Sequence, residues 1–196
     1  GTMSDGKIRV DDELMIYPGE QPTKARTLQI HEKDVEEAHA GQRTAVNLAG
    51  ITTDQVQRGC VVAKRDSVCA AKVMDVHLSL TKSTKIRLKK MFACKLYIGA
   101  REMMAKVVPL DSRELRAGQK GYAQILLERE VVVRRGDPFV LRTISPVETL
   151  GGGKVLDPYV NRYRRMGVSL LEAVRIKHTG TIKETVEVFV KAHPFQ

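Results

Sequence analysis

The sequence predicts a mainly β protein with two packed antiparallel β-barrels and a short helical C-terminal extension. From residue 7 to about residue 158, short apolar or alternating runs recur between glycine and aspartate turn residues. After Pro158 the spacing of apolar residues becomes helical. A chain of 196 residues with 42% hydrophobic residues is long and apolar enough to bury two small cores.

The first predicted domain covers residues 1–70. Its apolar runs are cut by turns such as Asp11-Asp12, which is typical of a small barrel. In residues 34–39, Val35 and Ala38 are three apart as in a helical turn, but the run is short, and we expect a loop. The predicted strands lie in KIRV, ELMIYP, KARTLQI, RTAVNL and CVVA.

The second predicted domain covers residues 71–160 and begins after a polar interruption near residues 66–72. Regular short strands between turn residues again favour an antiparallel barrel. The predicted strands lie in VHLSL, TKIRLKK, ACKLYIG, MMAKVVPL, GYAQILL, VVV and PFVLRT, with turns near Gly99, Asp111, Gly118, Gly121 and Gly136.

The remaining segment, residues 161–196, is predicted to be helical. Leu170, Leu171 and Val174 share one helical face, and residues 181–192 form a second candidate helix. The segment is too short for a self-contained helical domain. We therefore expect it to open a further region.

The chain is strongly basic, because 33 lysines and arginines against 23 acidic residues give a formal net charge of +10. This excess is spread through both halves and favours a polyanionic partner. Five tyrosines, four phenylalanines and no tryptophan make a base-stacking platform an unfavoured mode of binding. Phosphate contacts are the expected mode.

Three cysteines, Cys60, Cys69 and Cys94, are odd in number and lack C-x-x-C spacing, so neither a disulfide framework nor a zinc site is indicated. No apolar run approaches the roughly 20 residues of a membrane span. We expect a soluble, cytoplasmic protein without membrane contact.

Neither a catalytic site nor a metal site is predicted. The five histidines show no H-E-x-x-H pattern, and Asp34, Glu36 and Glu37 lack the spacing of a calcium loop, so a solvated loop is favoured. The sequence contains no G-x-x-x-x-G-K-[ST] phosphate loop and no recognisable activated nucleophile.

The stretch GDPFVLRTISPVETLGGGKVLDP is the most distinctive part of the chain. A turn, an apolar strand and the Ser145-Pro146 break lead to Gly151, Gly152 and Gly153. Three residues without side chains leave amides open to a phosphate or let another backbone come close. A tight barrel corner is the alternative interpretation.

Together with IRVDDELMIYP and TLQIHEKDVEEAHAGQRTAVNLAGI, this stretch resembles the selenocysteine-specific elongation factor family over roughly residues 1–160. The resemblance implies barrels of the elongation factor Tu domain II and III type, followed by a helical stub leading to a C-terminal winged-helix region. Gly1-Thr2 resembles the end of the family's first barrel strand, so we expect that strand to be truncated.

The resemblance also implies a function. In this family the two barrels help hold the aminoacyl-tRNA, and the factor delivers selenocysteyl-tRNA to the ribosome in its GTP state. GTP and Mg²⁺ would bind a GTPase domain of the same parent chain, so this segment is not expected to be an enzyme. A selenocysteine-insertion mRNA hairpin would be bound through the C-terminal region, and a monomer is expected.

The resemblance assigns candidate contacts residue by residue. Arg43 of the GQR motif falls where the family has an arginine lining the selenocysteyl pocket, and a fixed guanidinium suits an ionised selenol. The glycines 151–153 align with a turn that approaches the tRNA, and Arg134, Arg135 and Arg142 lie nearby in the sequence. The alternatives are an exposed strand arginine at position 43 and solvated arginines at the others.

A second class of function remains open. The same barrels would also serve a protein-interaction or scaffold module without tRNA specificity, because fold does not determine function.

Overall fold

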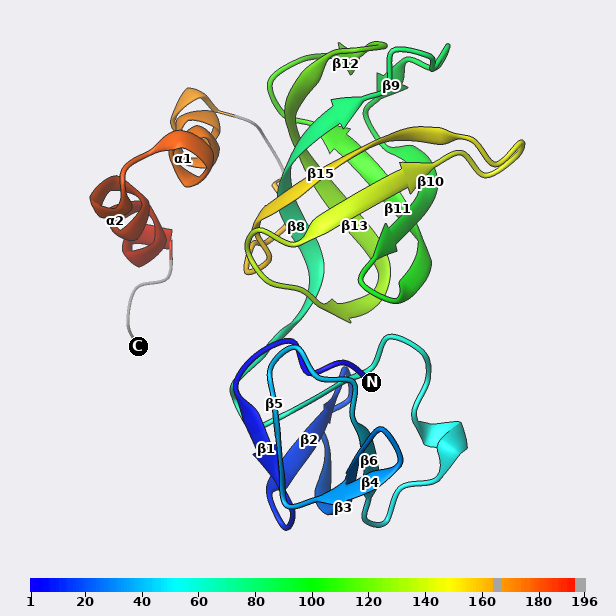
Figure 1. Cartoon of the computed structure of the whole chain (residues 1–196). Helices are drawn as coiled ribbons and strands as arrows, with labels where there is room; N and C mark the ends of the chain where they lie inside the picture. The colour runs from blue at the N-terminus through cyan, green and yellow to red at the C-terminus, as the bar shows by residue number, and fades with distance from the viewer. Residues whose placement is uncertain (164–166, 193–196) are drawn as a thin grey trace. The chain divides into compact units, whose positions relative to one another are not determined.

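The computed structural model describes residues 1–163 and 167–192, and its contacts divide the chain into two compact units, Gly1–Ala70 and Ala71–Gln196 (Figure 1). The predicted mainly β class with two C-terminal helices is confirmed. Residues 164–166 and 193–196 lie outside the described part, including the end of the predicted segment 161–196.

The first unit contains a five-stranded antiparallel sheet and a separate two-stranded one. In the larger sheet the strand order is β4-β3-β2-β7, and β6 also pairs with β3. Alternation along these strands buries Leu14, Ala25 and Leu28 in a small core that also includes Ile8 and Ala38. The elements are β1 Lys7–Arg9, β2 Glu13–Tyr17, β3 Gln21–Ile30, β4 Lys33–Val35, β5 Glu37–His39, β6 Ala45–Leu48, the 3-10 turn η1 Thr53–Gln55, and β7 Val61–Ala63.

The predicted loop at residues 34–39 is wrong, because two short strands, β4 and β5, run through it. β4 closes a hairpin with the end of β3, and β5 pairs with β1 so that Ala38 is fully buried opposite Ile8. These strands were not predicted because each has only three residues and most of their side chains are polar.

The second unit contains a closed six-stranded barrel with the order β10-β11-β13-β8-β15-β14. Figure 1 shows the strands of this barrel in the colour order of the chain, from cyan-green to yellow. A two-stranded sheet of β9 and β12 accompanies it. The bounds are β8 Ala70–Leu80, β9 Leu88–Lys89, β10 Phe92–Ile98, β11 Arg101–Pro109, β12 Glu114–Leu115, β13 Lys120–Val132, β14 Pro138–Arg142 and β15 Thr149–Asp157.

Alternation along parts of the strands builds the barrel core. Val76, Leu78 and Leu80 of β8 point into the core, while His77 and Ser79 between them are only half-buried. Leu96 of β10 and Ile125 of β13 fill the same core. The predicted run GYAQILL and the first two residues of VVV lie in one continuous strand, β13, because the polar residues between them keep extended backbone.

The three glycines lie inside strand β15 and do not form the turn that the resemblance implied. Gly152 is opposite Val140 of β14 and Ser79 of β8. A Cβ on Gly152 would lie 2.5 Å from the carbonyl oxygen of Phe139, and one on Gly151 or Gly153 would overlap a carbonyl oxygen of β8. Another backbone does approach this stretch closely, as the sequence predicts.

The C-terminal segment contains α1 Val168–Thr179 and α2 Ile182–Ala192. The helix α1 packs on the outside of the barrel, where Val174 contacts Leu110 and Leu156. The start of α2 is fixed by a capping box, in which Glu184 accepts the Thr181 N–H at 2.8 Å. Neither helix is both long and apolar enough to cross a membrane.

Candidate nucleic-acid interface

A cationic groove lies on the second unit where β8, β13, β15 and the β13–β14 turn meet the end of α1. Its volume is about 380 Å³. Basic and small residues dominate its wall, and Lys120, Arg135 and Lys154 carry its charge. The full lining comprises His77, Ser79, Lys120, Arg135, Gly136, Gly153, Lys154, Val155, Leu156, Lys177 and His178.

Strand register brings the floor of the groove together. His77 on β8 is the cross-strand partner of Lys154 on β15, so their side chains lie on the same outer face of the barrel. Ser79 is opposite Gly152, which has no side chain to cover it. The glycines of β15 therefore leave space on this face of the barrel between the side chains of His77, Ser79 and Lys154.

Two histidines from distant parts of the chain stack at the edge of this groove. The rings of His77 and His178 have centroids 4.2 Å apart, and the Tyr122 hydroxyl lies 3.1 Å from His178 Nδ1. Partial burial, then the charges of His178 and Lys120, lower the pKa of His77, while Asp111 opposes this effect.

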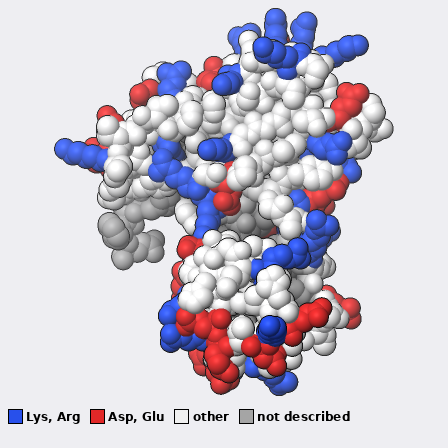
Figure 2. All heavy atoms as spheres, viewed as in Figure 1, with Lys and Arg blue, Asp and Glu red and all other residues white. Residues whose placement is uncertain are grey.

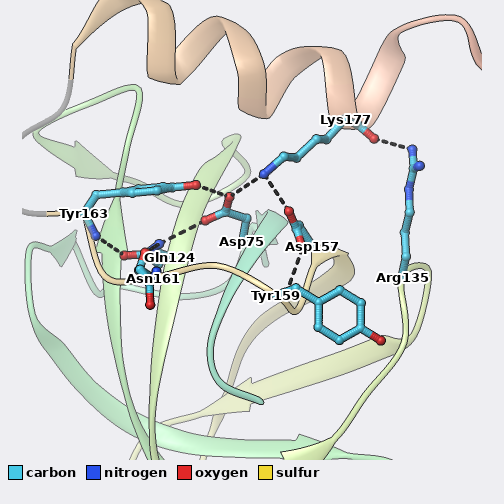
Figure 3. Close-up of polar contacts among 8 residues, drawn as sticks. All are labelled: Asp75, Gln124, Arg135, Asp157, Tyr159, Asn161, Tyr163 and Lys177. Atoms are coloured by element: carbon cyan, nitrogen blue, oxygen red, sulfur yellow. Dashed lines mark hydrogen bonds and ion pairs between the residues drawn. The ribbon is translucent and has the colours of Figure 1, made fainter. Parts of the chain in front are cut away.

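Behind the groove, buried charges attach α1 to the barrel (Figure 3). Asp75 on β8 and Asp157 on β15 are cross-strand partners, and both are fully buried. Lys177 of α1 reaches between them, with Nζ 2.6 Å from Asp157 Oδ2 and 3.5 Å from Asp75 Oδ2. Two carboxylates directly opposite each other repel, so the ammonium group is what permits this arrangement.

Neutral groups complete the network. Tyr163 donates its hydroxyl hydrogen to Asp75 Oδ2 at 2.5 Å, and Gln124 Nε2 donates to Asp75 Oδ1 at 3.1 Å. The Tyr159 N–H donates to Asp157 Oδ1 at 2.8 Å. Burial raises the pKa of Asp75, although Tyr163, Lys177 and Gln124 favour its ionised form. The cluster thus holds both the helix and the segment that follows β15.

Arg135 links the groove to the helices. Its guanidinium donates to the carbonyl of Lys177 at 2.5 Å, and it lies 5.8 Å from the centre of the Phe189 ring on α2 (Figure 3 shows the first contact). The Lys177 carbonyl belongs to the last turn of α1, where carbonyls lack helical partners and a cation is favourable. Arg135 is therefore already engaged with the protein.

The other arginines predicted from the sequence lie apart from the groove lining. Arg134 is exposed in the β13–β14 turn, and its backbone N–H donates to the Asp137 carboxylate at 2.8 Å. Arg142 is half-buried on β14, donates to the Val147 carbonyl at 3.2 Å and lies over Tyr97. Of the predicted set, only Arg135 and Gly153 line the groove.

Arg43 belongs to the first unit and is exposed. It is not on a regular strand, contrary to the prediction, because β6 begins only at Ala45. Instead Arg43 forms an isolated antiparallel bridge with Thr2, and the Gly1 carbonyl accepts the N–H of Thr44 at 3.0 Å. Residues 1–3 thus pair with the backbone around Arg43.

Several groove residues were not predicted as site residues. The sequence predicts no site for His77, His178 or Lys120, yet all three line the groove. The alternation in VHLSL does place His77 and Ser79 on one outer face, and Lys154 directly follows the glycines. Within residues 1–163 and 167–192, no group of three or more His, Cys, Asp or Glu residues could hold a metal ion.

The fold and the sequence define a class of protein. Residues 1–63 match the family model of elongation factor Tu domain 2, so the first unit is a translation-factor domain. Residues 71–162 match the β-barrel domain of the selenocysteine-specific elongation factor.

The chain belongs to the selenocysteine-specific elongation factor family. It is 33% identical over 165 residues to the selenocysteine-specific elongation factor of Desulfomicrobium baculatum, covering 84% of this chain and 26% of that protein. With the Methanocaldococcus jannaschii protein of the same name it is 26% identical over 210 residues, covering 97% of this chain and 43% of the relative. The chain therefore spans less than half the length of these relatives.

A solved structure shares the fold. The crystal structure of translation elongation factor SelB from Methanococcus maripaludis, in its apo form, matches with a TM-score of 0.68 at 24% identity. The match covers 79% of this chain and 38% of that one. At this level of identity the likeness supports the fold alone.

Proposed function

We propose that this chain supplies the aminoacyl-tRNA-binding domains of a factor that delivers selenocysteyl-tRNA to the ribosome in its GTP state. The observation that carries the proposal is the 33% identity, over 84% of the chain, with a relative named as a selenocysteine-specific elongation factor. The net charge of +10 is consistent with an RNA partner.

The groove supplies a means of contact with the tRNA. Lys120 and Lys154 are exposed at its wall, and the backbone of Gly153 forms part of its floor. Ammonium groups attract phosphates without reading bases, which suits recognition of a tRNA arm by its backbone. Lys177 adds little, because its charge is offset by Asp75 and Asp157.

The remaining parts of the mechanism belong to the parent protein in this proposal. GTP and Mg²⁺ would bind a GTPase domain of the same chain, and the selenocysteine-insertion mRNA hairpin would bind through a C-terminal region. The segment described here would contribute no hydrolytic chemistry. We propose a monomer that acts in the cytoplasm.

The test is tRNA binding to the 196-residue chain, measured by fluorescence anisotropy at several salt concentrations. We expect weak binding that falls steeply as salt rises, and a preference for selenocysteine tRNA over ordinary tRNA. Lys120→Gln/Lys154→Gln should lower the logarithmic salt slope by about 1.4 to 1.8, at roughly 0.7–0.9 for each lost phosphate contact. The control Lys33→Gln/Lys64→Gln changes two exposed lysines of the first unit.

Binding that stays flat between low and physiological salt would contradict the proposal and favour the scaffold alternative. An equal loss in the groove variant and its control would reject the groove as the contact.

Arg43 is proposed as a residue of the selenocysteyl pocket. Its backbone is fixed by the bridge to Thr2, although its side chain is exposed. In the full-length parent, Arg43→Ala should weaken selenocysteyl-tRNA binding by about 1.5–3 kcal/mol and leave seryl-tRNA binding nearly unchanged. Arg43→Lys should recover part of the loss. An unchanged preference for selenocysteyl over seryl tRNA would reject this role.

A further inference from the structure

A second basic surface lies at the β9–β12 end of the barrel and is not explained by the groove. Figure 2 shows lysine and arginine side chains gathered at the top of the second unit, where Figure 1 places β9 and β12. We call it the β9–β12 basic surface. It comprises seven exposed cations: Lys82, Lys85, Arg87, Lys89, Lys90, Arg113 and Arg116.

The pairing of β9 with β12 aims these side chains outward. Leu88 and Leu115 are partners and are buried in the barrel core. Because side chains alternate along a strand, Lys89 and its partner Glu114 lie on the opposite, outer face, together with Arg87. Two buried leucines therefore fix the direction of the charged residues around them.

The surface keeps a strong positive excess after its internal ion pairs are counted. Glu114 lies 2.7 Å from Arg116 Nε and 4.0 Å from Arg87 Nη1. The hydrogen bond from Arg116 is the main reason why the pKa of Glu114 is lowered, and the charges of Arg87 and Lys89 add to it. Residues 81–90 contain five cations and no acid, while residues 111–116 add two cations and two acids. One carboxylate thus faces three cations at the centre of the surface.

The chemistry of this surface favours a phosphate backbone over a protein partner. Protein interfaces usually have an apolar or aromatic centre. None of the exposed large hydrophobic side chains of the described residues lies in segments 81–90 or 111–116. Segments 81–90 and 111–116 contain no aromatic residue, so the surface offers no aromatic platform for unpaired bases, and its cations suit the phosphates on the outside of a duplex.

We propose that the β9–β12 basic surface binds the phosphate backbone of duplex RNA without reading its sequence. The turn after β12 leads directly from this surface to Lys120 in the groove, since the N–H of Gln119 donates to the Arg116 carbonyl at 3.0 Å. An RNA that touches the groove can therefore extend over β9 and β12. The proposal does not require that RNA to be a selenocysteine tRNA.

The test uses a 20-base-pair RNA duplex of arbitrary sequence and the 196-residue chain. Lys85→Gln/Lys89→Gln/Lys90→Gln should weaken duplex binding at least tenfold near 0.1 M salt and lower the logarithmic salt slope by about 2 to 3. The matched control Lys33→Gln/Lys64→Gln/Lys72→Gln removes the same charge from exposed lysines elsewhere and should change affinity less than threefold. Circular dichroism should show the same melting temperature for both variants.

Equal losses in the two triple variants would overturn the proposal, because only net charge would then matter. Binding of polyglutamate as tight as binding of the duplex would overturn the assignment to RNA. The groove variant Lys120→Gln/Lys154→Gln separates this proposal from the proposed function. If it and its control retain equal tRNA affinity while the β9–β12 variant loses duplex binding, the groove assignment fails and this inference stands.

Discussion

At the scale of single residues, Lys177 has the largest structural role that the sequence alone did not reveal. A lysine on an amphipathic helix normally points to solvent. Here it is 3% exposed and lies between two carboxylates that are each fully buried. A buried pair is weak support for stability as a whole, but the loss of one partner leaves an unpaired charge in the interior.

Replacing Lys177 should therefore be costly. We expect Lys177→Met to lower the free energy of unfolding by about 3–5 kcal/mol, because Asp75 and Asp157 would face each other without a cation. Urea unfolding followed by circular dichroism measures the change. In Lys177→Met/Asp157→Asn part of the loss should be recovered. A single replacement costing less than about 1 kcal/mol would contradict the role assigned to this ion pair.

Replacing Asp75 should change the free energy of unfolding differently from replacing Lys177. Its pKa is raised, mainly by burial, so the folded state binds a proton more readily than the unfolded state does. The protonated form of Asp75 therefore adds to the free energy of unfolding at pH values below the pKa of the unfolded state. This contribution is lost as the pH rises through the pKa of the folded state. At pH 7, Asp75→Asn should thus lower the free energy of unfolding by less than Lys177→Met. The same urea experiment compares them, and the reverse order would be inconsistent with this pKa shift.

At the scale of elements, strand β15 combines barrel closure with the groove. It pairs with β8 on one side and β14 on the other, and its glycines let both neighbours approach. Lys154, the next residue, is exposed to the groove. A glycine that closes the barrel and a lysine exposed to the groove are therefore adjacent in the chain.

Gly153→Ala should destabilise the barrel by more than about 3 kcal/mol, because its Cβ would overlap the carbonyl oxygen of His77, which cannot move without breaking the pairing of β15 with β8. Lys154→Ala should leave stability within about 0.5 kcal/mol and reduce RNA affinity. Thermal unfolding and anisotropy measure the two quantities. A fully stable Gly153→Ala barrel would show that the close approach is not required.

The same strand shows where prediction from the sequence stops. The close backbone approach was predictable, because three consecutive glycines have few other uses. The strand itself was not, since glycine disfavours extended structure and the alternation of side chains disappears where there are none. Strand β9 lies within the predicted strand TKIRLKK, whereas β12 was not predicted, because its two residues show too little periodicity to distinguish strand from loop.

At the scale of the whole molecule, the two units should unfold as separate bodies. The barrel core draws its buried residues from residues 71–155, and the smaller core of the first unit from residues 8–38. We expect residues 71–196 to fold when produced alone. In hydrogen exchange, the amides of β10, β11 and β13 should exchange more slowly than those of β1 to β6, because only unfolding of the whole barrel exposes the larger core. Loss of protection at one common rate would contradict this independence.

The site was harder to predict than the fold. Local alternation marks the barrel strands, so most of the strands, though not their order in the barrel, could be predicted from segments of five to ten residues. The groove unites side chains as distant as His77 and His178, and Lys177 reaches carboxylates that are 102 and 20 positions away in the chain. No local pattern links such residues. The charge excess favours a polyanionic partner but does not indicate where on the surface such a partner would bind.

The enclosure of Lys177 also has a chemical consequence. An amine that is paired with two carboxylates and shielded from water reacts slowly with acylating reagents, whereas the exposed lysines of the same chain react quickly. Its modification would occur only when α1 lifts away from the barrel. Mass spectrometry of briefly acetylated protein would thus record how often this helix detaches, using a reporter that the chain already carries.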